Sequence, residues 1–138
     1  MANVEFTDNS VKVKAALDDA TIAYLYEAAG AMEAQTKRNQ TRVDTGQTKN
    51  AWTYAVDESS GVATVGNPLE NAIWEEFGTG EYALNGDGRK GGWFYKDQKG
   101  EGHFTHGKTP LRPLFSAFNS MKSKLIARAE QIVKERMD

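Results

Sequence analysis

The chain has 138 residues, of which 39% are hydrophobic, with a formal net charge of −2 and a mean hydropathy of −0.63. This length suits one domain with a small core, spanning residues 1–138. The absence of cysteine excludes disulfides, thiolate metal sites and a cysteine nucleophile. Proteins that bind nucleic-acid phosphates usually carry a basic excess, and this slightly acidic chain does not. No apolar run reaches the ~18 residues of a membrane-spanning helix.

The first expected element is a long helix over residues 11–39. Residues suited to a helix N-cap precede it, and basic residues near its end suit the helix dipole. Gly30 lies inside it, and either close packing or a local bend would explain this glycine. The helical spacing places five side chains on one face: Leu17, Tyr24, Ala28, Met32 and Gln35.

A turn at residues 43–46 is expected to end this helix. Its aspartate or threonine can hydrogen-bond the local backbone, and its glycine accepts a positive φ. The turn residues of interest are Asp44, Thr45 and Gly46. Residues 51–57 then alternate between apolar and polar, and residues 62–66 follow after a turn. This pattern predicts an antiparallel β-hairpin.

Residues 71–77 predict a two-turn helix, which the glycines that follow it end. Ile73 and Phe77 are four residues apart and share a face, so we expect Phe77 to anchor the next segment to the core. Glu75 and Glu76 are adjacent and do not stack as an acid–base pair. A capping or interface role is therefore favoured for them, with Glu76 holding the turn or a neighbouring subunit.

A glycine-rich segment, residues 81–108, comes next, and we call it the arm. Residues 92–96 and 102–106 could pair as a hairpin with residues 97–100 at its tip. Long loops in small domains are functional or disordered, and aromatic residues argue against plain disorder. We therefore expect the arm to contact a partner, mainly through Trp93, Phe94 and Tyr95.

The last expected element is a second long helix, from Pro113 to about Arg136. Proline is tolerated in the first helical turn. A helical stripe is formed by Leu114, Phe118, Met121, Leu125, Ala129 and Ile132, and it is widened by Phe115, Ile126 and Val133. The sequence thus predicts an α+β fold, in which two long helices pack on a small antiparallel sheet and a glycine-rich arm or hairpin extends from it.

Several patterns resemble chemical sites without completing one. Residues 86–91 match G-x-G-x-x-G, but an extended segment follows instead of the helix that a dinucleotide site requires, so a flexible loop is favoured. The two histidines are three residues apart and point to opposite faces of a strand. An enzymatic alternative is a metal-dependent, nuclease-like site around Asp97, Lys99, His103 and His106. Another alternative is a nucleic-acid surface made from the basic and aromatic residues of the arm.

Four segments, in this order, resemble the tail-completion proteins that join heads to tails in long-tailed bacteriophages, also described as minor capsid or neck proteins. They are the long first helix with its Asp-Thr-Gly turn, the hairpin, the segment 72–80, and the start of the last helix. The resemblance covers nearly the whole chain. The positions that match the family's recurring turns are Asp44, Thr45, Gly46, Glu76, Phe77, Gly78, Thr79, Arg112, Pro113 and Ala117, with Trp74 in the same segment.

This resemblance implies an α+β fold and a structural, non-enzymatic role in the virion neck, with assembly in the host cytoplasm. It implies a ring of identical subunits, expected to be six-fold, between the head connector or stopper and the tail terminator or tail tube. DNA would pass nearby without specific binding, and no catalytic residue, metal or cofactor is implied. The arm is longer than the minimal family pattern and departs from it there. Its glycines and aromatic residues, and not the resemblance, are the basis for expecting an inter-subunit or inter-ring contact.

Overall fold

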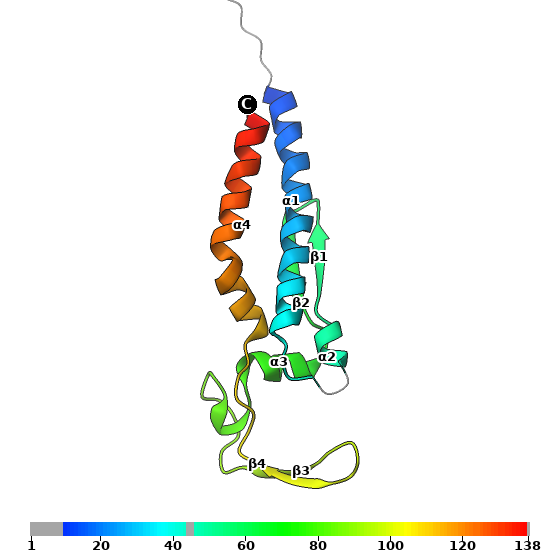
Figure 1. Cartoon of the computed structure of the whole chain (residues 1–138), viewed down its shortest axis with the longest axis vertical. Helices are drawn as coiled ribbons and strands as arrows, with labels where there is room; N and C mark the ends of the chain where they lie inside the picture. Colours follow the sequence, from blue (N-terminus) through cyan, green and yellow to red (C-terminus); the bar gives the residue numbers. More distant parts are fainter. Residues whose placement is uncertain (1–9, 44–45, 138) are drawn as a thin grey trace, which may run out of the picture.

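The computed structural model describes residues 10–43 and 46–137. Its long helices, α1 (Ser10–Asn39) and α4 (Pro113–Met137), lie side by side and antiparallel (Figure 1). Two short helices lie near the end of this pair, α2 (Gln47–Asn50) and α3 (Glu70–Phe77). The arm extends beyond them, so the described chain is a rod with the helix pair at one end and the arm at the other (Figure 1).

The fold is α+β, as the sequence predicts. Strands β1 (Thr53–Asp57) and β2 (Val62–Gly66) pair antiparallel, with Thr53 opposite Gly66 and Asp57 opposite Val62. This sheet packs on α1, and α4 packs on another side of α1 (Figure 1). The first long helix is therefore the middle layer between the sheet and the second helix.

The arm contains the second antiparallel sheet, made of β3 (Trp93–Lys96) and β4 (Gly102–Thr105). A single 3-10 turn, η1 (Gly80–Tyr82), precedes it. The predicted hairpin of the arm is confirmed, with Trp93 opposite Thr105 and Lys96 opposite Gly102. No described helix is long and apolar enough to cross a membrane.

The apolar core is small, because the buried hydrophobic residues of the described chain are mostly alanines. They are Ala20, Ala29, Met32, Trp52, Ala72 and Ala117. The largest fully buried side chains are instead Gln40, Glu75, Thr36 and Pro113. Most of these lie where α1 ends, α3 ends and α4 begins, a region that we call the junction. Buried polar groups require hydrogen-bond partners, so specific polar contacts must hold the junction together.

Polar contacts in the junction begin at the end of α1. The Trp52 indole N–H donates to Gln40 Oε1 at 3.2 Å, and Thr36 Oγ1 donates to the carbonyl of Met32 at 2.7 Å. The Asn39 side-chain amide donates to the carbonyl of Pro113 at 3.1 Å, which connects the end of α1 to the start of α4.

Gly30 faces β1, and a Cβ built on it would lie 3.9 Å from the Tyr54 ring. That is an ordinary van der Waals distance, so the space around Gly30 does not require a glycine.

The apolar stripe of α4 is narrower than the sequence predicts. Ala117 is buried and Leu125 is half-buried, with its carbonyl accepting a 2.7 Å hydrogen bond from Tyr24 on α1. Four members of the predicted stripe are exposed instead, and the prediction was wrong for them: Phe115, Phe118, Ile126 and Val133. Periodicity finds the apolar residues of a helix, but the width of the contact depends on how much of the partner helix lies opposite.

Candidate functional site

Glu76 caps the start of α4 from a different helix. Its Oε2 accepts the backbone N–H of Leu114 at 2.9 Å, and its Oε1 accepts that of Phe115 at 2.9 Å. The first N–H groups of a helix have no partner within the helix, and a carboxylate also suits the positive end of the helix dipole. Of the two roles that the sequence left open for Glu76, capping or an interface, the structure shows capping, and through it α3 fixes the direction in which α4 leaves the junction.

Arg112 and Pro113 lie in this same site. Arg112 has φ 59°, a left-handed conformation that costs a non-glycine residue about 1–2 kcal/mol. The Glu75 carbonyl accepts the backbone N–H groups of Leu111 at 2.7 Å and Arg112 at 3.1 Å, which holds this turn. The Arg112 guanidinium lies 4.0 Å from the Phe115 ring centroid and its Nε 3.9 Å from Glu76 Oε1.

Glu75 ties the end of the arm to the body. Glu75 is only 1% exposed. Its carboxylate pairs with Lys108 Nζ and lies 3.8 Å from Arg42 Nε. The Arg42 guanidinium also donates to the carbonyl of Thr109 at 2.6 Å. A buried carboxylate is tolerated only when cations pair with it, so these contacts define the position of the arm relative to α3.

The two ends of the arm are hydrogen-bonded to each other. Thr79 N–H donates to the Lys108 carbonyl at 2.9 Å, and Lys108 N–H donates to Thr79 Oγ1 at 2.8 Å. Glu81 N–H donates to the His106 carbonyl at 2.9 Å. We call these contacts the arm base. Gly80 lies within it at φ 61°, where a Cβ would collide with the His106 carbonyl oxygen.

The arm hairpin has two different faces because side chains alternate along a strand. Trp93 and Tyr95 point toward α3, where with Trp74 and Thr79 they line a groove of about 620 Å³. Phe94 points away and is 80% exposed, and its ring lies 4.9 Å from that of Phe104 on the same outer face. The structure therefore separates the three aromatics that the sequence grouped together.

The remaining predicted site residues lie elsewhere or carry different roles. Asp44 and Thr45 lie outside the described residues, and Gly46 has the expected positive φ, at 84°. Gly78, at φ 75°, ends α3, and a Cβ there would lie 2.8 Å from the Lys108 carbonyl oxygen. The prediction that Phe77 anchors the arm in the core was wrong, because Phe77 is 41% exposed and α3 buries Ala72, Glu75 and Glu76 instead.

The two histidines have separate partners. His103 Nε2 lies 2.8 Å from Asp97 Oδ2, whereas His106 Nδ1 lies 3.1 Å from Glu81 Oε2. The hydrogen bond with His103, followed by one from the Glu101 N–H, lowers the pKa of Asp97 below the usual aspartate value. The glycine motif at residues 86–91 leads into β3 and not into a helix, so it lacks the helix N-terminus of a dinucleotide site.

A mutation of Glu76 tests whether the junction depends on this cap. Glu76→Ala leaves the N–H groups of Leu114 and Phe115 without their acceptor, and we expect it to lower the free energy of unfolding by about 2–3 kcal/mol. Glu76→Gln, which keeps one oxygen acceptor, should cost less. Urea denaturation measures both values, with exposed Glu70→Ala as a control from the same helix. Equal losses in Glu76→Ala and Glu70→Ala would contradict the capping role.

Sequence reasoning missed Glu101 and the pairing of Glu75 with Arg42 and Lys108. The register of the arm hairpin could have revealed Glu101, because it lies across the tip from Asp97. The pairing of Glu75 joins residues far apart in the chain, and no local pattern reports it. Comparisons of this chain with protein-family models, with curated proteins and with solved structures give no match.

Proposed function

We propose that this chain is a non-enzymatic structural protein of the neck of a long-tailed bacteriophage, where identical copies form a ring that joins the head to the tail. The proposal starts from the resemblance of its turn motifs to tail-completion proteins. The observation that carries it is the amount of apolar surface that the described chain leaves exposed, on α4 and on the outer face of the arm.

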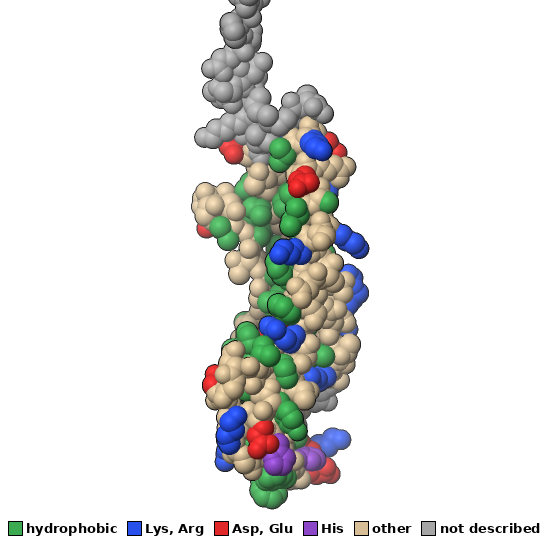
Figure 2. Space-filling view, turned by 90° about the vertical axis from the view of Figure 1, so that its left-hand side faces the viewer, with side chains coloured by type: hydrophobic (Ala, Val, Ile, Leu, Met, Phe, Trp, Pro, Cys, Tyr) green, Lys and Arg blue, Asp and Glu red, His purple; other side chains and the backbone are tan. Residues whose placement is uncertain are grey.

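The first exposed surface runs along α4. Phe115, Phe118, Ile126 and Val133 are 43%, 46%, 51% and 50% exposed. Their spacing places them within a narrow arc of the helix. Figure 2, which looks onto the side of α4, shows a broken line of hydrophobic side chains along the rod, with Lys and Arg side chains among them. Extended apolar surface of this kind marks protein–protein interaction sites.

The second exposed surface is the outer face of the arm, made by Phe94 and Phe104. It lies at the opposite end of the rod from most of α4 (Figure 1). A ring needs a heterologous contact, in which one surface of each subunit meets a different surface of the next. Two unlike apolar surfaces on one rigid rod meet this requirement, with the arm of one copy reaching the helix pair of its neighbour.

The expected partners in the neck are the head connector or stopper on one side and the tail terminator or tail tube on the other. The net charge of −2 suits a subunit beside a channel through which DNA must move without binding. The buried junction gives such a ring a rigid body, since Glu75 and Glu76 fix both the arm and α4.

A joining assay tests this function. Phage particles made without this chain are expected to accumulate as separate DNA-filled heads and tails, and the purified protein should restore joined particles visible by electron microscopy. Immunogold labelling should place the chain at the head–tail junction. Particles that join normally without it would contradict the proposal.

A further inference from the structure

We propose that the tip of the arm binds a transition-metal ion of the Zn²⁺ type through Asp97, Glu101 and His103. This site is separate from the apolar surfaces of the proposed ring, and binding of a metal ion to it does not depend on the proposed role in the phage neck. The tip has three features that suit a metal ion: its three ligands share a face, their geometry is fixed by other contacts, and their chemistry selects a class of metal.

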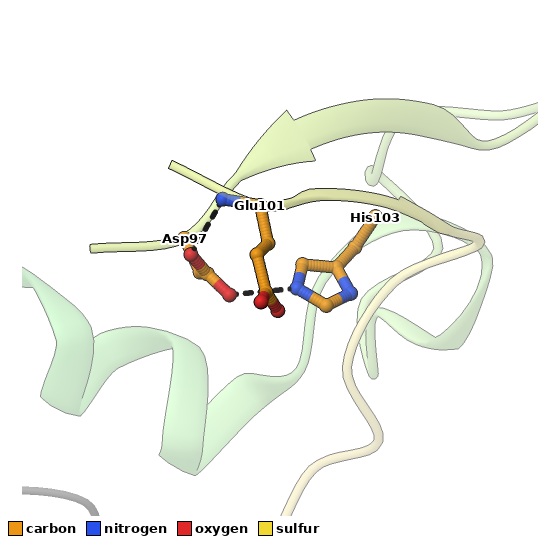
Figure 3. Close-up of side chains that lie close together, drawn as sticks. All are labelled: Asp97, Glu101 and His103. Atoms are coloured by element: carbon orange, nitrogen blue, oxygen red, sulfur yellow. Dashed lines mark hydrogen bonds and ion pairs between the residues drawn. The ribbon is translucent and has the colours of Figure 1, made fainter. Parts of the chain in front are cut away.

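The hairpin register brings the three side chains to one face. Glu101 and His103 are two residues apart along the chain, so they point to the same side of β4. Asp97 lies across the tip, where its N–H donates to the Glu101 carbonyl at 2.9 Å. Figure 3 shows the three side chains projecting to the same side of the strands, and their ligand atoms all lie within 4.8 Å of one another.

Contacts outside the ligand atoms already orient two of these side chains. Asp97 Oδ1 accepts the backbone N–H groups of Lys99 and Glu101, each at 2.9 Å, which directs Oδ2 toward His103 Nε2 at 2.8 Å. The His103 ring stacks on Tyr95, with centroids 5.3 Å apart and planes at 30°. Such supporting contacts reduce the cost of gathering ligands around an ion.

The ligand set favours Zn²⁺ and similar ions over Mg²⁺ or Ca²⁺. One imidazole nitrogen with two carboxylate oxygens suits Zn²⁺ and its neighbours, whereas Mg²⁺ and Ca²⁺ prefer oxygen ligands alone. The ion takes the place of the hydrogen bond between His103 and Asp97, so Nε2 must present its lone pair and the ring proton must lie on Nδ1. Three protein ligands at an exposed tip leave a fourth position for water or for a group from another protein.

The two histidines of the chain provide a matched test. The sample is protein without a histidine tag whose histidines carry ¹⁵N, and ¹H–¹⁵N correlation spectra of the imidazole rings follow a Zn²⁺ titration. Zn²⁺ should shift the Nε2 resonance of His103 and leave the ring resonances of His106 unchanged. Glu101→Gln and His103→Gln should each weaken Zn²⁺ binding at least about tenfold. His106→Gln, which removes the histidine paired with Glu81, should bind Zn²⁺ as the unmodified chain does.

Glu101→Gln is the decisive variant, because the hydrogen bond from Glu101 to Asp97 comes from its backbone and survives the substitution. Unchanged backbone amide shifts in β3 and β4 verify that the hairpin remains folded. The proposal would be overturned if Zn²⁺ left the His103 ring unaffected, if Glu101→Gln bound as tightly as the unmodified chain, or if His106→Gln weakened binding equally.

Discussion

Gly80→Ala is expected to lower the free energy of unfolding of the arm base by about 2–4 kcal/mol. Two costs add at this position. Gly80 has φ 61°, which strains a residue with a side chain, and the new Cβ would collide with the His106 carbonyl oxygen. Relief of the collision requires the Glu81–His106 hydrogen bond to break. Hydrogen exchange at the Glu81 amide should therefore accelerate, and thermal unfolding should shift to lower temperature.

Gly86→Ala is the matched control for this prediction. Gly86 also has a positive φ, at 71°, but a Cβ built on it meets nothing within 4 Å. The Gly86→Ala substitution should therefore cost only the backbone strain of about 1 kcal/mol and leave hydrogen exchange at the Glu81 amide unchanged. Equal effects of the two substitutions would mean that close packing at the arm base does not hold the arm.

Phe94→Ser is expected to weaken self-association strongly while the subunit stays folded. Phe94 is 80% exposed and contacts Phe104 on the outer face of the arm, so its loss removes little from the core. An aromatic residue buried at the centre of an interface contributes about 2–4 kcal/mol, which corresponds to a loss of affinity of about 30- to 1,000-fold. Sedimentation velocity over a range of concentrations measures this change.

Val62→Ser controls for the general loss of exposed apolar surface. Val62 is 52% exposed on β2, away from both proposed contact surfaces. The Val62→Ser variant should assemble as the unmodified chain does. If Phe94→Ser assembles equally well, the outer face of the arm does not make the proposed contact, and the groove lined by Trp74 and Trp93 becomes the next surface to test.

The sequence predicted the elements whose patterns are local. The first long helix was expected at residues 11–39 and spans Ser10–Asn39, and the last was expected from Pro113 to about 136 and spans Pro113–Met137. Both hairpins were found as well, since alternation and turn residues lie within a few positions of each other. The polar contacts of the arm tip are also local, since Asp97 accepts the N–H groups of Lys99 and Glu101, but they were not predicted from the sequence.

What the sequence could not predict depends on contacts between distant residues. The spacing of Ile73 and Phe77 showed that they share a face of α3, but not that this face is exposed. The buried face of that helix carries Glu75 and Glu76, and hydropathy ranks such residues as outward-facing. Their burial depends on partners 33 or more positions away, such as Lys108 and the start of α4.

The oligomeric mass of the purified chain tests the proposed ring most directly. Native mass spectrometry, supported by negative-stain electron microscopy, should give a single closed species with a defined number of subunits, expected to be six. Phe94→Ser should reduce that species to smaller forms. A chain that stays monomeric at all accessible concentrations, or that grows into open filaments of no fixed length, would contradict the ring.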